Sequence, residues 1–162
     1  MVVALTFVSC SASKKIAEDS EGLKREAKDF SLTIIESYFS KDCEKVFNSM
    51  SDSLLIMDGD GIISKFEVEE RLCDAVKRAI REEGKTIRDY TESYNIEMLT
   101  ANELAEKYNY SLPEYYLTVE SDFFFIGQRL KVGEEVDFIW DDLFVFMVRK
   151  QNQNWILKGI SG

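Results

Sequence analysis

The chain of 162 residues has no histidine. Without an imidazole, histidine-based triads, histidine general bases and most zinc or non-haem iron sites are excluded. Each of them needs a side chain that titrates near neutral pH or binds a metal. Any catalysis would therefore depend on Asp, Glu, Tyr, Lys or Cys side chains.

Basic residues are also few, with 20 Lys and Arg against 30 Asp and Glu and a formal net charge of -10. A chain of this charge repels phosphate backbones, and it lacks the clustered basic face that nucleic-acid binding requires. Gly59 and Gly61 are not joined by the third glycine and the Lys-Ser/Thr pair of phosphate-binding loops. We therefore expect no nucleic-acid partner and no cofactor.

Apolar residues are plentiful, since hydrophobic residues make up 45% of the chain and aromatic residues 12%. A chain of this length is usual for one domain and can bury about 70% of the surface that its unfolded form exposes. We expect residues 1–20 to be a signal-like segment with a tether, and residues 21–162 to fold as a single α+β domain.

The first ten residues, MVVALTFVSC, are uncharged, mostly apolar and end in Cys10. They resemble the export signal of bacterial lipoproteins, in which an aliphatic or similar residue and then small residues precede a cysteine that receives lipid; here Phe7, Val8 and Ser9 hold those places. The polar residues 11–22 would then form a flexible tether. The resemblance implies a cell-envelope protein, lipid-anchored or exported, whose contact with the membrane is the lipid on Cys10. The alternative is an ordinary buried first strand.

Two further cysteines, Cys43 and Cys73, form an even pair that could bridge in an oxidising compartment. Each also falls within a helical pattern, where a free cysteine packs as a small hydrophobic side chain. We favour two free cysteines, and leave the disulfide as the alternative.

Apolar residues recur with the helix period at residues 21–40, after a cap at Asp42, and at residues 64–83. The expected strands are residues 53–57, 94–99, 115–126, 136–140, 143–149 and 155–160, with a short helix at residues 100–108. Helices early and a meandering antiparallel sheet late predict an α+β domain. In such a domain the N-terminal helices pack on one face of a curved, cone-like sheet.

A long first helix, a short helix around FSKDCEKVFNSM, the hairpin SLLIMDGDGIIS, the helix KFEVEERLCDAVKRAI and the closing strands DDLFVFMVRK and NWILKGIS follow in this order. The order resembles the nuclear transport factor 2-like superfamily, which includes ketosteroid isomerase-like and SnoaL-like domains, over residues 21–162. The resemblance implies a cone whose concave sheet and helices enclose a ligand pocket. It implies no activity, because that fold hosts enzymes, binders and scaffolds. The helix at residues 100–108 departs from the compact members and would cap the pocket's mouth or decorate an edge.

Aromatic residues crowd the expected strands, and those on one side of a curved sheet would line an apolar pocket. The candidate lining residues are Phe30, Tyr38, Asp122, Phe124, Trp140 and Phe144. We expect a non-enzymatic domain that binds a small apolar ligand or a protein, with a homodimer through the same face as an alternative. The runner-up is a small isomerase or dehydratase built on Asp122 and Tyr38, the Asp/Tyr chemistry of ketosteroid isomerase-like members.

The stretch IMDGDGIISKFEVEE offers one candidate calcium site within residues 58–67. Its ligands in the register of an EF-hand loop would be Asp58, Asp60 and Glu67. The first ligand position, however, holds Ile56, which has no side-chain oxygen. A hairpin explains every residue, because DGDG makes the turn and Ser64 with Glu67 caps the next helix. We therefore expect a hairpin and no metal, with a calcium-binding module as the second alternative function.

Overall fold

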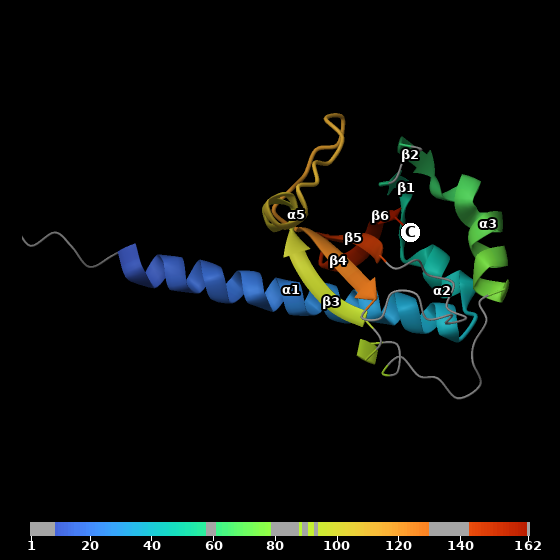
Figure 1. Ribbon diagram of the computed structural model, residues 1–162, viewed down its shortest axis with the longest axis horizontal. Helices are drawn as coiled ribbons and strands as arrows, with labels where there is room; N and C mark the ends of the chain where they lie inside the picture. The colour runs from blue at the N-terminus through green and yellow to red at the C-terminus, as the bar shows by residue number, and fades with distance from the viewer. Residues whose placement is uncertain are drawn as a thin grey trace, which may run out of the picture.

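The structure is a computed structural model that describes residues 9–57, 61–78, 88, 91–92, 94–129 and 143–161. Its main elements in chain order are α1 (Ser9–Phe39), α2 (Cys43–Asn48), β1 (Met50–Ile56), β2 (Gly61–Ser64), α3 (Lys65–Arg78), β3 (Tyr94–Thr100), α5 (Ala101–Tyr108), β4 (Asp122–Arg129), β5 (Leu143–Gln151) and β6 (Asn154–Ser161). Figure 1 shows their arrangement. The α+β class and the order of elements predicted from the sequence are confirmed. The predicted strand at residues 136–140 lies outside the described residues.

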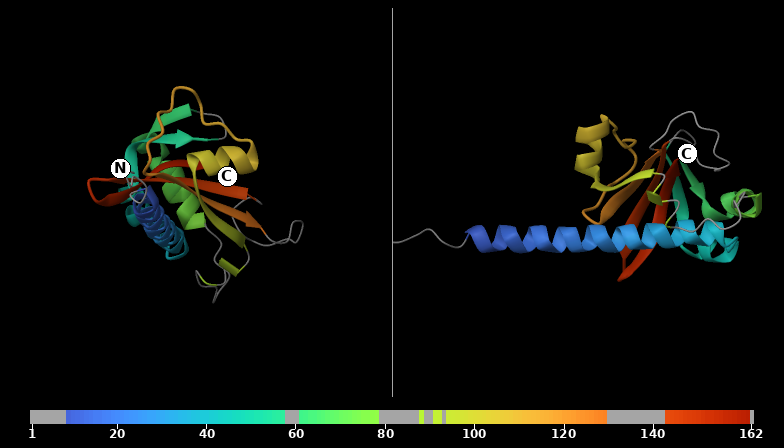
Figure 2. Two further views of the ribbon diagram at one scale, coloured as in Figure 1. Left: turned by 90° about the vertical axis from the view of Figure 1, so that its left-hand side faces the viewer. Right: turned by 60° about the horizontal axis from the view of Figure 1, so that its bottom comes forward.

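The six strands form one curved, unclosed sheet in the order β2-β1-β6-β5-β4-β3 (Figure 2). Neighbouring strands are antiparallel except β1 and β6, which run parallel. The sheet is therefore mixed, whereas the sequence analysis predicts an antiparallel one. Since α3 lies between β2 and β3 in the chain, no hairpin turn fixes the direction of the later strands relative to the earlier ones.

Helices α1, α2 and α3 pack on one side of the sheet, which we call the helical face. Figure 2 shows α1 on this side and α5 on the other. The helix period of α1 places Ala27, Ile34 and Ile35 in this core, where they are buried. Alternate positions of β4 and β5 supply its largest aromatic side chains: Phe123, Phe125, Phe144 and Phe146.

The opposite side, which we call the insert face, is covered by α5 and by residues 109–121, an irregular segment that we call the strap. Its buried core consists of Leu55, Leu104, Phe124, Ile126, Val145 and Met147. The sequence analysis predicts α5 at a pocket's mouth or at an edge; the structure lays it on a face of the sheet, where Leu104 and Tyr108 line a pocket. This position buries the apolar side of α5, since Leu104 is only 4% exposed.

The strap occupies much of the stretch predicted as a strand at residues 115–126, and β4 begins only at Asp122. α5 ends at Asn109, whose φ of 50° is left-handed. A turn follows in which the N–H of Tyr116 donates to the carbonyl of Pro113 over 2.8 Å. The turn directs the chain across the face of the sheet. There it crosses inner strands whose backbones are already paired on both sides, so that a strand-forming composition cannot produce a strand.

α1 spans 31 residues, about 46 Å at 1.5 Å per residue, and its first part extends beyond the sheet (Figure 1). It begins at Ser9, so residues 11–22, which the sequence analysis assigns to a flexible tether, are helical. Their Ala, Lys, Glu and Ile residues form helices readily, and the chain's single proline lies far away at Pro113. Within the described part of the chain, no helix has both the length and the apolar character needed to cross a membrane.

The predicted caps and the predicted hairpin are confirmed. The carboxylate of Asp42 accepts a hydrogen bond of 2.9 Å from the N–H of Lys45 at the start of α2. β1 and β2 pair antiparallel up to Ile56 opposite Gly61. At the start of α3 the N–H of Ser64 donates to Glu67 over 3.0 Å, so this carboxylate serves as a helix cap.

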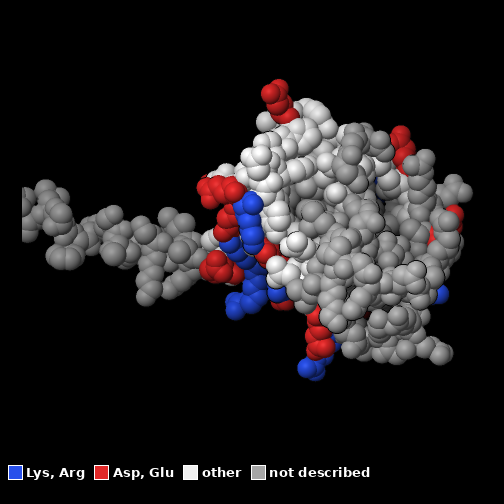
Figure 3. Space-filling model, in the orientation of Figure 1, with Lys and Arg blue, Asp and Glu red and all other residues white. Residues whose placement is uncertain are grey.

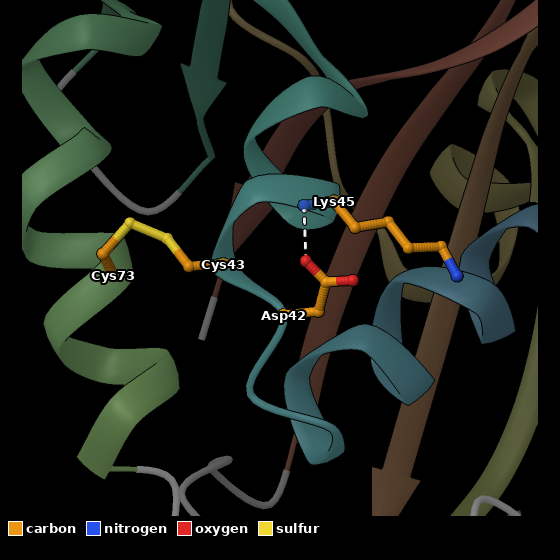
Figure 4. Close-up of a disulfide and its surroundings, with 4 residues drawn as sticks. All are labelled: Asp42, Cys43, Lys45 and Cys73. Carbon is orange, nitrogen blue, oxygen red and sulfur yellow. Dashed lines mark hydrogen bonds between the residues drawn. A yellow bond between two sulfur atoms is a disulfide. The ribbon is translucent and has the colours of Figure 1, made fainter.

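Cys43 of α2 and Cys73 of α3 form a disulfide, with their Cα atoms 5.2 Å apart (Figure 4). The preference for two free cysteines was therefore wrong. Both helices lie on the helical face and pack against each other, which brings the two Cα atoms within the distance that a bridge requires. Helix periodicity in the sequence says nothing about this packing between helices.

Candidate functional site

The residues predicted to line one pocket lie on two sides of the sheet. Phe30 and Tyr38 of α1 and Phe144 of β5 belong to the core of the helical face. Phe124 belongs to the insert face, and Asp122, two positions earlier on the same strand, shares that side. Trp140 lies outside the described residues. The sheet therefore separates Phe30, Tyr38 and Phe144 from Asp122 and Phe124, and these five do not line a common cavity.

Phe144 packs into the helical core. Its ring lies 5.5 Å from the rings of Tyr94 and Phe146 and 6.0 Å from that of Phe125, measured between centroids. Its ring also covers Gly127 on the next strand, where a Cβ atom would approach it to 2.1 Å. Contacts this close on several sides identify Phe144 as a core residue.

Asp122 is fully buried and forms a bidentate ion pair with Arg149. The distances are 2.5 Å from Arg149 Nε to Oδ1 and 2.8 Å from Arg149 Nη2 to Oδ2. The N–H of Val119 also donates to Oδ2 over 2.9 Å. The hydrogen bond from Arg149 to Asp122 raises the pKa of this guanidinium above its ordinary value. Asp122 is thus engaged by three donors and is not available as a general base in this arrangement.

The same arginine fastens the strap to the sheet. Arg149 Nη2 donates to the carbonyl of Leu117 over 3.2 Å and to the hydroxyl of Tyr116 over 3.0 Å. Burial raises the pKa of Tyr116 to about 12, and the charge of Asp122 acts in the same direction, so the phenol stays protonated at neutral pH. The group of Asp122, Arg149 and Tyr116 therefore anchors the strap.

Tyr38 lies on the other side of the sheet from this group. Burial raises the pKa of its phenol to about 12, so it too is neutral near pH 7. An isomerase built on Asp122 and Tyr38 needs both side chains at one substrate molecule, with the carboxylate as the base and the phenol as the hydrogen-bond donor to the enolate oxygen. The sheet between them prevents this.

The structure describes only some of the residues predicted to bind calcium or to carry lipid. Asp58 and Asp60 lie outside the described residues, whereas Glu67 caps α3. Cys10 lies in the first turn of α1, and only its backbone is described.

The insert face contains an apolar pocket of about 220 Å³. It is lined by Met57, Leu104, Tyr108, Tyr110, Ile126, Val145 and Ser161. Its floor is one row across three strands, because Ile126 pairs with Val145 and Val145 pairs with Ser161. Leu104 and Tyr108 stand one turn apart on α5 and form one wall.

The remaining wall comes from the start of the strap. The hydroxyl of Tyr110 donates to the carbonyl of Met57 over 3.0 Å, and the N–H of Met57 donates to the carbonyl of Ile160 over 2.9 Å. The strap is thereby joined to the ends of β1 and β6. Segments far apart in the sequence thus close around the pocket.

α5 is held in place by a complete cap and by links to two other elements. Thr100 and Glu103 form both halves of a capping box. Lys24 of α1 reaches Glu103 over 2.7 Å, and Lys107 pairs with Glu97 of β3. Charged side chains of both signs gather where α1 passes α5 (Figure 3). Burial acts to raise the pKa of Glu103, but the hydrogen bonds from Lys24 and Thr100 hold it below its ordinary value.

A second cavity of about 340 Å³ lies between the start of α5 and the end of the strap. Its lining is more polar: Thr100, Ala101, Asn102, Thr118, Val119, Glu120 and Asp122. The buried carboxylate at this cavity is already engaged by Arg149, and the Thr100 side chain by the capping box. The apolar pocket is therefore the better candidate for a ligand site.

The sequence analysis missed all seven residues of the apolar pocket. The sequence did contain one indication of two of these residues. Leu104 and Tyr108 lie one turn apart and give α5 an apolar side, which must pack against another part of the protein. The row of Ile126, Val145 and Ser161 follows from the strand register, which the sequence did not predict.

Comparisons with known proteins leave the function to be argued from the site. No family model and no curated protein matches the chain. A designed nuclear transport factor 2-like protein is similar in structure, with 12% sequence identity and a TM-score of 0.48. The match covers 84% of this chain and 95% of the designed one. A likeness at this level indicates no ligand and no activity.

Proposed function

We propose that the protein is an exported binding domain, held at a membrane by lipid on Cys10, that takes a small apolar ligand and catalyses no reaction. The observation that carries the binding function is the apolar pocket between α5 and the sheet. A concave, mostly apolar site with a few hydroxyl groups is the usual form of a small-molecule site.

Two features support export. The segment MVVALTFVSC resembles a lipoprotein signal ending in Cys10, and Cys43 is joined to Cys73 by a disulfide. Structural disulfides persist in oxidising compartments such as the bacterial periplasm and are rare in the cytosol.

The absence of catalysis is supported by the positions of the two best acid-base candidates. Asp122 is engaged by Arg149 and by the backbone of Val119, and Tyr38 lies beyond the sheet. Neither reaches the pocket lined by Leu104 and Val145.

Ligand binding is tested by a fragment screen read from the methyl NMR signals of Met57, Leu104, Ile126 and Val145. We expect uncharged fragments to shift these signals in a saturable way. Leu104→Phe should fill the pocket and abolish the shifts. Its matched control is Leu117→Phe on the strap, where Leu117 is 83% exposed and the same change should have no effect. A screen in which no fragment moves the pocket signals would refute ligand binding here.

The lipid anchor is tested by expression in a bacterial host with labelled palmitate. We expect label in the membrane fraction, its loss in Cys10→Ser and its retention in Ser13→Ala. An unlabelled, freely soluble product from the unaltered chain would refute the anchor.

Protein binding is the second candidate function, and the outer surface of the strap favours it. Tyr115, Leu117 and Val119 alternate along the strap and are 59%, 83% and 46% exposed. Several exposed apolar side chains within one short segment are a feature of contact surfaces. If the partner is a second copy of the chain, light scattering should show a dimer that Leu117→Asp converts to a monomer. A monomer at all concentrations would exclude the homodimer.

A further inference from the structure

We infer that the apolar pocket selects a neutral ligand about the size of one aromatic ring that carries a hydroxyl or an aromatic amine group. This inference rests on the proposed binding function and specifies the ligand class. The pocket lies on the insert face, opposite the side of the sheet that the three N-terminal helices cover.

The volume limits the size of the ligand. An apolar cavity of about 150 Å³ can hold benzene, whereas pockets for drug-sized molecules usually span about 300 to 1,000 Å³. At about 220 Å³ the pocket lies between the two. It has room for one ring with a small substituent.

The lining excludes charge. None of the seven lining residues is acidic or basic. Close to the pocket, Lys107 pairs with Glu97 and Arg149 pairs with Asp122. Lys158 of β6, whose pKa is lowered by burial, is not among the lining residues. A carboxylate or ammonium group entering the pocket would lose its hydration without gaining an opposite charge, which is strongly unfavourable.

The lining also favours an aromatic ring over an alkyl chain. Tyr108 and Tyr110 present two ring systems to a small space, and aromatic rings attract each other beyond the gain from burial. The remaining walls, which include Leu104, Ile126 and Val145, supply apolar surface for the rest of the ring.

A hydroxyl or aromatic amine group on the ligand can form a hydrogen bond with a residue in the floor of the pocket. Ser161 ends the row of three residues that forms the floor, and its hydroxyl can both donate and accept a hydrogen bond. A phenol or aniline can lie with its ring against Val145 and its polar group at Ser161. A purely hydrocarbon ring would leave that hydroxyl without a ligand partner.

The test compares four probes of similar size, which are toluene, p-cresol, benzoate and benzylammonium, by titration of the methyl signals of Leu104, Ile126 and Val145. We expect p-cresol to bind about threefold to tenfold more tightly than toluene, the range for one net hydrogen bond. Both ions should bind at least about 30-fold more weakly than p-cresol. Ser161→Ala should bring p-cresol down to the affinity of toluene and leave toluene unchanged.

The outcomes separate the ligand class from the binding function. If benzoate or benzylammonium binds at these methyl groups as tightly as p-cresol, the neutral class is refuted while the binding function stands. If Ser161→Ala lowers the affinities of toluene and p-cresol equally, the polar contact is refuted. If no probe moves the pocket signals in the unaltered chain, the binding function itself fails. Leu104→Phe should abolish the binding of every probe, and Leu117→Phe should leave binding unchanged. This pair of results would show that the methyl shifts arise from binding in the pocket.

Discussion

The two sides of the sheet bury apolar surface by different means. The helical face is covered by regular helices with periodic apolar stripes, and its core is dominated by aromatic side chains packed on one another. The insert face is covered by the short helix α5 and the irregular strap, which a few polar contacts hold down. Both sides have a buried core, and the apolar pocket lies on the side that α5 and the strap cover. Changes to each side should therefore have different consequences.

The largest effect is expected at the anchor of the strap. Arg149→Leu leaves the carboxylate of Asp122 buried without its partner, which should lower the free energy of unfolding by about 3 to 5 kcal/mol. Urea denaturation measures this loss. Amide hydrogen exchange at Tyr116 and Val119, whose N–H groups are hydrogen-bonded, should accelerate more than exchange in α1, because the strap loses its contacts with Arg149.

The matched control replaces both partners. Asp122→Leu combined with Arg149→Leu removes the buried charges together and should recover much of the stability. The strap should remain loose, because the carbonyl of Leu117 still lacks its donor and the N–H of Val119 now also lacks its acceptor. Equal protection of the strap in the double variant and the unaltered chain would show that the ion pair does not hold it.

Removing the disulfide on the helical face should cause the second largest loss of stability. Replacing Cys43 and Cys73 together by serine opens a loop with a sequence separation of 30 residues, which should reduce stability by about 3 kcal/mol. Thermal unfolding with and without reductant measures the effect, and the double variant should be insensitive to reductant. The methyl signals of the apolar pocket should stay unchanged, because α2 and α3 lie on the other side of the sheet. Movement of those signals would show that the two faces are coupled.

A smaller effect is expected from overfilling the helical core. Gly127→Ala brings a Cβ atom to within 2.1 Å of the Phe144 ring, which must then move. The expected loss of stability is about 1 to 3 kcal/mol by denaturation. If the clash with the ring is the cause, adding Gly127→Ala to Phe144→Leu should cost much less than adding it to the unaltered chain. An equal cost in both backgrounds would indicate backbone strain instead.

The sequence predicts the helical side better than the insert side, for physical reasons. The period of α1, the cap at Asp42 and the hairpin ending at Gly61 are local signals, and the structure has all three. The position of the strap depends on the turn after Pro113 and on Arg149, which lies 32 residues after Leu117. The disulfide and the floor of the pocket likewise depend on how elements pack and on strand register. Such long-range contacts leave no periodic trace in the sequence.

The smallest effect concerns how firmly α5 is held as the pH falls. The pKa of Glu103 in the folded chain lies below its ordinary value of 4.5, since the hydrogen bonds from Lys24 and Thr100 outweigh the effect of burial. The lowered pKa makes a stabilising contribution that is present above the unfolded value and is lost as the pH falls through the folded one. Because the Glu103 side chain is 42% exposed, solvent screening keeps this contribution small. Amide exchange in α5 should therefore rise modestly below about pH 4.5.

Glu103→Gln should remove this pH dependence and loosen α5 slightly at neutral pH. The matched control is Glu26→Gln on the same helix as Lys24. The pKa of Glu26 is also lowered, by hydrogen bonds from Lys150 and Trp155, but Glu26 joins α1 to β5 and β6 and does not touch α5. In that variant α5 should keep its response to acid. If both variants abolish the response, the acid sensitivity belongs to α1 as a whole, and α5 is not an independently held cover of the insert face.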